Sequence, residues 1–176
     1  MGFGHTAKGI QQLCVELTAI IHANFHVAAT IEPAKRRSSL YSDFDDHYEA
    51  MINTKSIELA VNLRSLFDRC AAFANPKKLA QAERESTAIR FIEGSGPETL
   101  RECSNKIIHA GYFLFEYDRY ESTGNDGQHF SNEVQSSVIK LSGWRLRKKW
   151  LCTLDLLKFC EEAHLAAQEL ELEFQQ

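Results

Sequence analysis

Apolar residues recur at intervals of three and four over two long stretches in the first half of the chain. Residues 7–29 carry one such stripe, and residues 46–74 carry another with no glycine or proline inside it. Both patterns predict amphipathic helices. The stretch between them, residues 30–43, contains Pro33 and a basic triplet, which is typical of an exposed connection. Pro76 ends the second helix, because proline disfavours helical geometry in the residue before it.

Three further helical segments are predicted in the second half. Residues 77–92 are charged and rich in alanine, which indicates a short or irregular helix. Residues 97–110 begin with Pro97, a residue that suits the first turn of a helix. Residues 144–174 again place apolar residues at helical spacing, and their glutamate-rich end is typical of a solvated helix face.

A pair of strands is predicted before the last helix. Residues 111–120 alternate aromatic side chains with others, and residues 136–142 form an apolar partner strand. Residues 121–135 then make a long hairpin tip, and Gly143 ends the second strand. The sequence therefore predicts a mainly α fold, an antiparallel bundle of four to five helices with a small β-hairpin inserted before the last helix, as one domain over residues 1–176.

Composition excludes some classes of function. A chain of 176 residues with 44% hydrophobic content can bury a core as one domain. Its 20 Lys and Arg against 24 Asp and Glu give a net charge of −4, so nucleic acid can be bound only through a local basic patch. The five cysteines form no CxxC pair. Reduced thiols are expected, which indicates a cytoplasmic protein.

No segment predicts contact with a membrane. The first residues lack the basic, then apolar, then small-residue pattern of a signal peptide. The longest uncharged run, residues 17–31, contains two histidines and an asparagine and is too short to cross a bilayer. We therefore expect neither membrane insertion nor a membrane anchor.

The predicted helix over residues 97–110 carries the candidate chemistry. Its Arg101, Asn105 and His109 are spaced by four residues and lie along one side, while apolar residues gather on the other. An imidazole can exchange a proton with a ribose 2′-hydroxyl or a leaving oxygen. A guanidinium can hold a phosphate through two parallel hydrogen bonds, and an amide can orient either group. Such a set indicates either a site that handles phosphate or an ordinary polar helix face. It would suit RNA cleavage without a metal, because the 2′-hydroxyl is itself the nucleophile.

The order of elements and the segment from Asn105 to His109 resemble the HEPN superfamily of helical domains. Members of that family carry an Arg-x4–6-His motif on a late helix, whereas seven residues separate Arg101 from His109 here. The resemblance implies a homodimer in which the two motif helices meet in a cleft. It also implies either a metal-independent endoribonuclease of a toxin–antitoxin or phage-defence system, with an antitoxin as partner, or a non-catalytic binding domain.

A basic run opens the predicted last helix. Positive charge at that end opposes the helix dipole, which favours contact with phosphate, although a solvated face paired with glutamates is the alternative. Trp144 and Trp150 flank the run. Aromatic residues among basic ones can stack on bases, but Trp150 also fits the apolar register of the helix. The candidate RNA-contacting residues are Lys106, Arg145, Arg147, Lys148 and Lys149.

Each candidate also has an ordinary structural explanation. His109 can interact with the carbonyls at its helix end, and Arg101 can form a surface ion pair with Glu98. His22 and His26 have the spacing of a shared zinc site, but no further ligand accompanies them, so neither metal nor cofactor is expected. Three hypotheses stand: an RNA-binding protein with ribonuclease activity, a non-catalytic interaction or regulatory module, and a nucleotide-binding companion of a nucleotidyltransferase.

Overall fold

Four helices and four strands make up the parts of the chain that the computed structural model describes, residues 7–30, 39–73, 84–123 and 127–174. The helices are α1 (Ala7–Thr30), α3 (Ser39–Phe73), α5 (Leu100–His109) and α6 (Leu156–Phe174). The strands are β1 (Ile89–Glu93), β2 (Tyr112–Thr123), β3 (His129–Arg145) and β4 (Lys148–Asp155). They form one antiparallel sheet in the order β1-β4-β3-β2.

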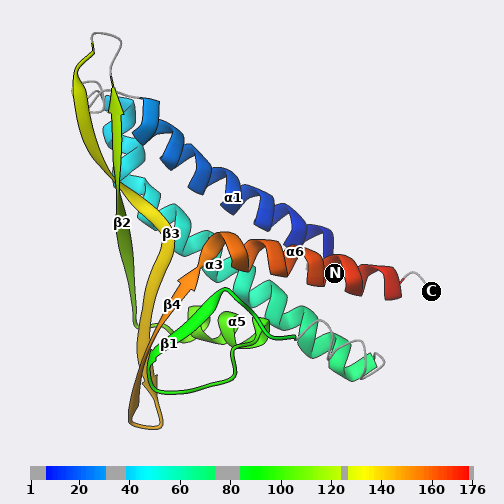
Figure 1. The fold of residues 1–176 in the computed structure, drawn as a ribbon. Coiled ribbons are helices and arrows are strands. Elements are labelled where there is room, and N and C mark those ends of the chain that lie inside the picture. Colours follow the sequence, from blue (N-terminus) through cyan, green and yellow to red (C-terminus); the bar gives the residue numbers. More distant parts are fainter. Residues whose placement is uncertain (1–6, 31–38, 74–83, 124–126, 175–176) are drawn as a thin grey trace.

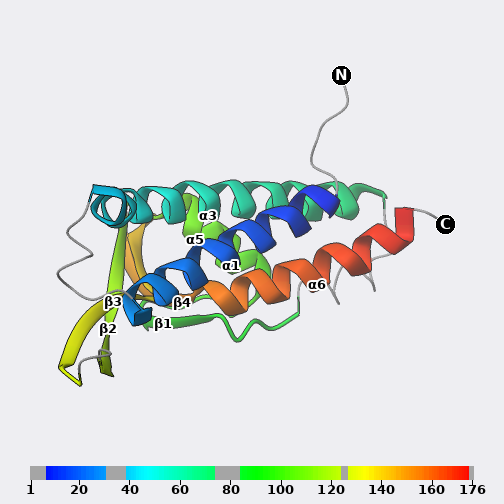
Figure 2. The same cartoon turned by 90° about the horizontal axis from the view of Figure 1, so that it is seen from above.

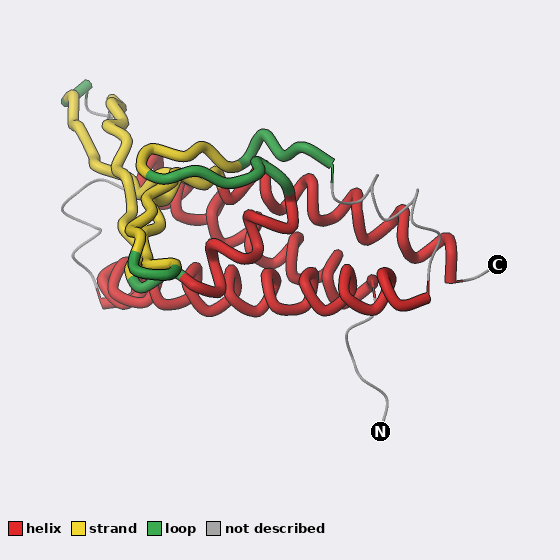
Figure 3. Tube along the Cα trace, turned by 90° about the horizontal axis from the view of Figure 1, so that it is seen from below, coloured by secondary structure: helices red, strands yellow, loops and turns green. Residues whose placement is uncertain are grey.

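The three long helices lie side by side, with α1 between α3 and α6 (Figures 1 and 2). The strands gather at one end of this helical layer (Figure 3). The start of α1 and the end of α6 lie at the other end, away from the strands (Figure 3). The short α5 packs against α3 and also touches β3, which places the end of α5 beside the sheet.

One hydrophobic cluster joins the helices to the inner face of the sheet. Tyr48, Phe67 and Phe159 are the largest of its fully buried side chains. Burial raises the pKa of Tyr48 to about 12, because a phenolate would lose its hydration there. The sheet contributes Ile139, Leu141, Cys152 and Leu154 from its two central strands.

The predicted helices over residues 7–29, 46–74 and 97–110 are confirmed as α1, α3 and α5. Their apolar stripes are long or regular enough to be distinguished from alternation. The helix α3 starts at Ser39, earlier than predicted. The rest of the expected connection, residues 31–38 with the basic triplet, lies outside the described residues.

The predicted fold class is wrong, because the chain is a mixed α/β protein with a four-stranded antiparallel sheet rather than a mainly helical bundle. The largest error concerns residues 144–174, expected to form one helix. The helix begins only at Leu156, and Lys148–Asp155 form β4. Buried residues at Trp150, Cys152 and Leu154 alternate with more exposed ones, but the four-residue interval from Trp150 to Leu154 imitates a helical stripe.

Two further segments are more extended than predicted. Within the expected helix over residues 77–92, the described part is extended and leads into β1, while residues 77–83 lie outside the described chain. The expected hairpin tip, residues 121–135, is mostly strand, because β2 continues to Thr123 and β3 starts at His129. Its polar side chains hide the alternation by which strands are recognised. Residues 124–126 lie outside the described chain.

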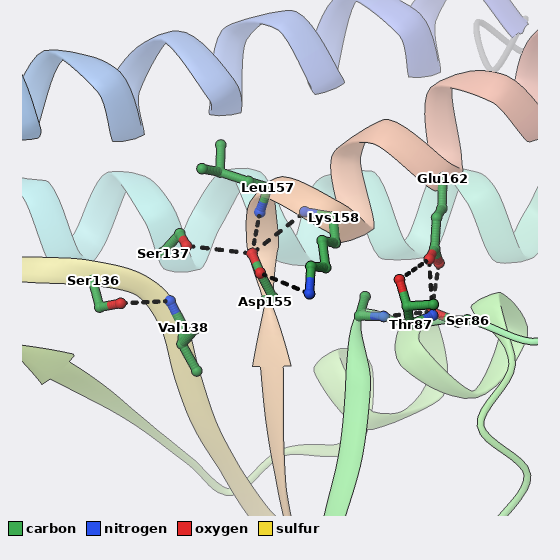
Figure 4. A network of polar contacts seen from close by, with 10 residues as sticks. Ser86, Thr87, Ser136, Ser137, Val138, Asp155, Leu157, Lys158 and Glu162 are labelled. Carbon is green, nitrogen blue, oxygen red and sulfur yellow. Dashed lines mark hydrogen bonds and ion pairs between the residues drawn. The ribbon is translucent and has the colours of Figure 1, made fainter.

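Polar side chains fix the junction between β4 and α6 (Figure 4). The Asp155 carboxylate accepts hydrogen bonds from the backbone N–H groups of Leu157, at 3.1 Å, and Lys158, at 3.4 Å. It therefore caps the start of α6 and separates strand from helix. One turn later, Glu162 accepts hydrogen bonds from the Ser86 hydroxyl and from the Thr87 hydroxyl and N–H (Figure 4). This contact attaches the chain before β1 to α6.

Candidate nucleic-acid interface

A cavity of about 760 Å³ lies between α3, α5 and the hairpin that joins β3 to β4. Three cationic residues, a histidine and two tryptophans are among the residues that line it. Because these residues come from three separated parts of the sequence, only the folded chain brings them together. The lining residues are Arg64, Glu102, Asn105, Lys106, His109, Trp144, Arg145, Leu146 and Trp150.

The helix α5 is held at its start and along its apolar side. The Thr99 hydroxyl accepts a hydrogen bond from the N–H of Glu102 at 3.2 Å and caps the helix. Leu100, Cys103 and Ile107 are buried. His109 is the last residue of the helix and is exposed. The amphipathic pattern seen in the sequence thus turns His109 toward solvent at the cavity.

A buried ion pair forms the floor of the cavity. The Nζ atom of Lys106 lies 3.2 Å from Oε1 of Glu102, and both side chains are less than a tenth exposed. The same Nζ lies 4.2 Å from the centre of the Trp150 ring and 5.2 Å from that of Phe91. A carboxylate and two aromatic faces offset the cost of taking this ammonium out of water. Lys106, expected to contact RNA, therefore serves mainly to join α5 to the sheet.

Asn105 and Arg101 belong to a polar network between α5 and α3. Asn105 donates to Oε2 of Glu102 at 3.0 Å and accepts a hydrogen bond from Arg64. Arg64 and Arg101 both bind the carboxylate of Asp68. The structure thus brings Asn105 and His109 to the cavity, whereas Arg101 is directed to α3 and is absent from the cavity lining.

Gly143 makes the close contact between α5 and the hairpin. A Cβ atom at this position would lie 2.5 Å from Cζ2 of Trp150 and 2.8 Å from the carbonyl oxygen of His109. Gly143 is paired with Trp150 across the two strands, so the indole of Trp150 lies over the glycine. Rather than ending a strand, Gly143 lets the end of α5 approach β3, and this brings His109 beside the hairpin.

The four basic residues expected at a helix start lie instead on the β3–β4 hairpin, and all are exposed. We call residues 144–149 the basic hairpin. Its turn has Leu146 at φ 50° and Arg147 at φ 68°, the left-handed geometry of a two-residue type I′ turn. Each non-glycine residue in this region costs about 1–2 kcal/mol. The usual Asn-Gly signal is missing, so the turn was not predicted.

Sequence reasoning missed three residues of the cavity: Arg64, Glu102 and Leu146. The i, i+4 spacing of Glu102 and Lys106 is a local signal for their pairing. No comparable signal connects Arg64 on α3 with Asn105, since they are 41 positions apart in the sequence. Burial raises the pKa of Cys103, on the opposite side of α5, to about 12, so this thiol is a poor nucleophile.

No protein-family model matches this chain, and no curated protein or solved structure matches it significantly. None of the helices over residues 7–30, 39–73, 100–109 and 156–174 has the length and apolar character needed to span a bilayer. In the same described portion of the chain, no group of three or more His, Cys, Asp or Glu side chains is arranged to hold a metal ion. Function must therefore be inferred from the geometry of the cavity and the basic hairpin.

Proposed function

We propose that this protein binds RNA through the basic hairpin and the adjoining cavity. The observation that carries the proposal is the concentration of four exposed cations on one hairpin of a chain whose net charge is −4. Within the described part of the chain, Lys149 alone of these four forms an ion pair with an acidic residue, Glu93 at 3.4 Å. Clustered Lys and Arg side chains attract the phosphate backbone and release its counterions.

Cleavage of the bound RNA is the second part of this proposal, and the position of His109 favours it. This exposed imidazole and the Arg145 cation line one cavity. The 2′-hydroxyl of a ribose would attack the adjacent phosphorus as His109 takes its proton, the bond to the 5′-oxygen would break, and a 2′,3′-cyclic phosphate would form. The resemblance of the segment from Asn105 to His109 to the HEPN motif supports the same role.

The charge of the basic hairpin gives the test of RNA binding. Changing Arg145, Arg147, Lys148 and Lys149 to Gln is expected to weaken binding and to reduce the slope of log K against log salt by about 2–3, since each phosphate contact contributes about 0.7 for single strands. The measurement is fluorescence anisotropy with a labelled RNA at several salt concentrations.

A charge-matched control replaces four exposed cations away from the hairpin, Lys8, Arg84, Arg90 and Lys158, by Gln. Its salt slope should stay close to that of the unmodified protein. Equal losses in the two variants would mean that net charge, and not the basic hairpin, governs binding. Unchanged binding in the hairpin variant would leave the hairpin as a contact for a protein partner, the non-catalytic alternative.

We further propose a symmetric homodimer in which the His109 residues of two copies approach each other. One cavity supplies one imidazole, and a second copy would supply the group that protonates the leaving oxygen. Light scattering at micromolar concentration should give twice the chain mass of 20.0 kDa. Substituting Glu for exposed Tyr112, three residues beyond His109, should lower that mass if the interface adjoins the cavity. A monomer at this concentration would contradict the dimer.

A further inference from the structure

Trp144, which begins the basic hairpin, and Trp150, which follows it, have opposite environments. Trp150 is 4% exposed and is covered by Lys106 and the close approach at Gly143. Trp144 is 69% exposed, although it lies next to the same cavity. Burial of Trp150 is explained by its packing role. The structure gives no packing role to Trp144.

The turn after Trp144 adds a second observation that points to a ligand. Leu146 is 91% exposed and has a left-handed backbone, as does Arg147. Non-glycine residues held in sparsely populated backbone regions cluster at active sites and ligand clamps. Trp144 and Leu146 therefore form an apolar tip within a cluster of cations.

Cations flank this apolar tip on both strands of the hairpin. Trp144 is paired with Lys149 across the hairpin, and Arg145 with Lys148. Paired residues on neighbouring strands lie close together, so a base on the Trp144 indole would have cations beside it for its flanking phosphates. Base–indole stacking requires a free base face, which a duplex does not offer within its length.

We propose that Trp144 stacks on an unpaired base, which makes single-stranded RNA the ligand class of this site. The inference rests on the RNA-binding proposal and deepens it. Phosphates bound by the basic hairpin supply affinity without regard to base, and Trp144 supplies preference for unpaired nucleotides. Leu146 packs against the edge of the stacked base or its sugar.

The test compares three probes of equal length, about 12 nucleotides: a single-stranded RNA, its duplex, and a strand of the same ribose phosphates without bases. The unmodified full-length protein should bind the base-bearing strand at least about tenfold more tightly than the abasic one. Trp144→Ala should remove this difference and leave the salt slope unchanged, while Trp144→Phe should retain part of it. Tyr120→Ala removes an exposed aromatic residue of β2, at 45% exposure, and should have no effect.

Fluorescence gives an independent readout, because Trp144 and buried Trp150 are the only tryptophans of the chain. RNA should quench the emission, and Trp144→Phe should abolish the quenching. Equal binding of the base-bearing and abasic strands would overturn stacking while RNA binding stands. Preference for the duplex would also overturn it. Absence of binding to all three probes would overturn both the RNA-binding and the stacking proposals. They would also be overturned if the protein bound vesicles of anionic phospholipid instead of RNA and if this binding depended on Leu146.

Discussion

Glu102→Ala is expected to lower the free energy of unfolding by about 3–5 kcal/mol. The change leaves the ammonium of Lys106 buried without its carboxylate, because this side chain is only 7% exposed. It also removes the acceptor of the Asn105 amide, which weakens the network between α5 and α3. The remaining contacts of Lys106 with the faces of Trp150 and Phe91 recover only part of the loss. Urea unfolding followed by circular dichroism measures the effect.

Two controls separate burial of charge from loss of an ordinary ion pair. Glu16 pairs with Lys55 at 2.7 Å, but both side chains are about a third exposed, so Glu16→Ala should cost less than about 1 kcal/mol. The double change Glu102→Leu with Lys106→Met removes both buried charges and should recover most of the stability. If Glu102→Ala cost no more than Glu16→Ala, the interior ion pair would not stabilise the junction.

The helices that the sequence predicts well either have a long stripe of apolar residues or are bounded by a residue such as proline. In α3 the apolar spacing continues over many turns, which no strand can imitate. In α5, Pro97 lies just before the helix begins, and the separation of apolar from polar residues indicates that His109 lies on the solvent side. Local sequence was sufficient at both places.

The sheet was underestimated because its turn and its strands lack local signals. The β3–β4 turn uses Leu146 and Arg147 where Asn-Gly would be expected. In β4, buried residues alternate with more exposed ones, but Trp150 and Leu154 are also four positions apart, which is the spacing of a helical stripe. The hydrogen bonds of β4 to β1 and β3 decide the outcome, and such long-range pairing is not readable from spacing within one segment.

The candidate site was predicted in its residue types more than in its arrangement. His109 was a catalytic candidate and Arg145 an RNA-contacting candidate, and both line the cavity although they are 36 positions apart in the sequence. Their meeting depends on Gly143, where the absence of a Cβ admits the end of α5. The role of Lys106 was not predictable, since the aromatic rings that cover it come from β1 and β4.

The position of Arg101 on α5 agrees with the helical spacing, but a tertiary contact determines where its side chain points. It lies on the expected side of α5, but Asp68 on α3 binds its guanidinium. Because of this contact, a substitution of Arg101 should affect the cavity only indirectly, by weakening the packing of α5 on α3. Arg145 is better placed than Arg101 for the proposed contact with phosphate, because it is exposed and lines the cavity.

His109→Ala is expected to reduce RNA cleavage by a factor of about 10²–10⁴, the usual contribution of a general acid or base. Affinity for RNA should change little, because the proposed phosphate contacts lie on the basic hairpin. The imidazole is exposed, so the cost in stability should stay within about 0.5 kcal/mol. Single-turnover cleavage of a labelled RNA measures the rate, and parallel anisotropy measures the affinity.

The matched control is His22→Ala, which removes an exposed histidine of α1 on another surface and should leave the rate unchanged. Cleavage should persist in EDTA and stop when 2′-deoxyribose replaces ribose, because the attacking hydroxyl belongs to the substrate. If His109→Ala cleaved as fast as the unmodified protein, the imidazole would have no part in proton transfer. If the unmodified dimer bound single-stranded RNA without cutting it, the proposed cleavage would be wrong and the cavity would be a binding site alone.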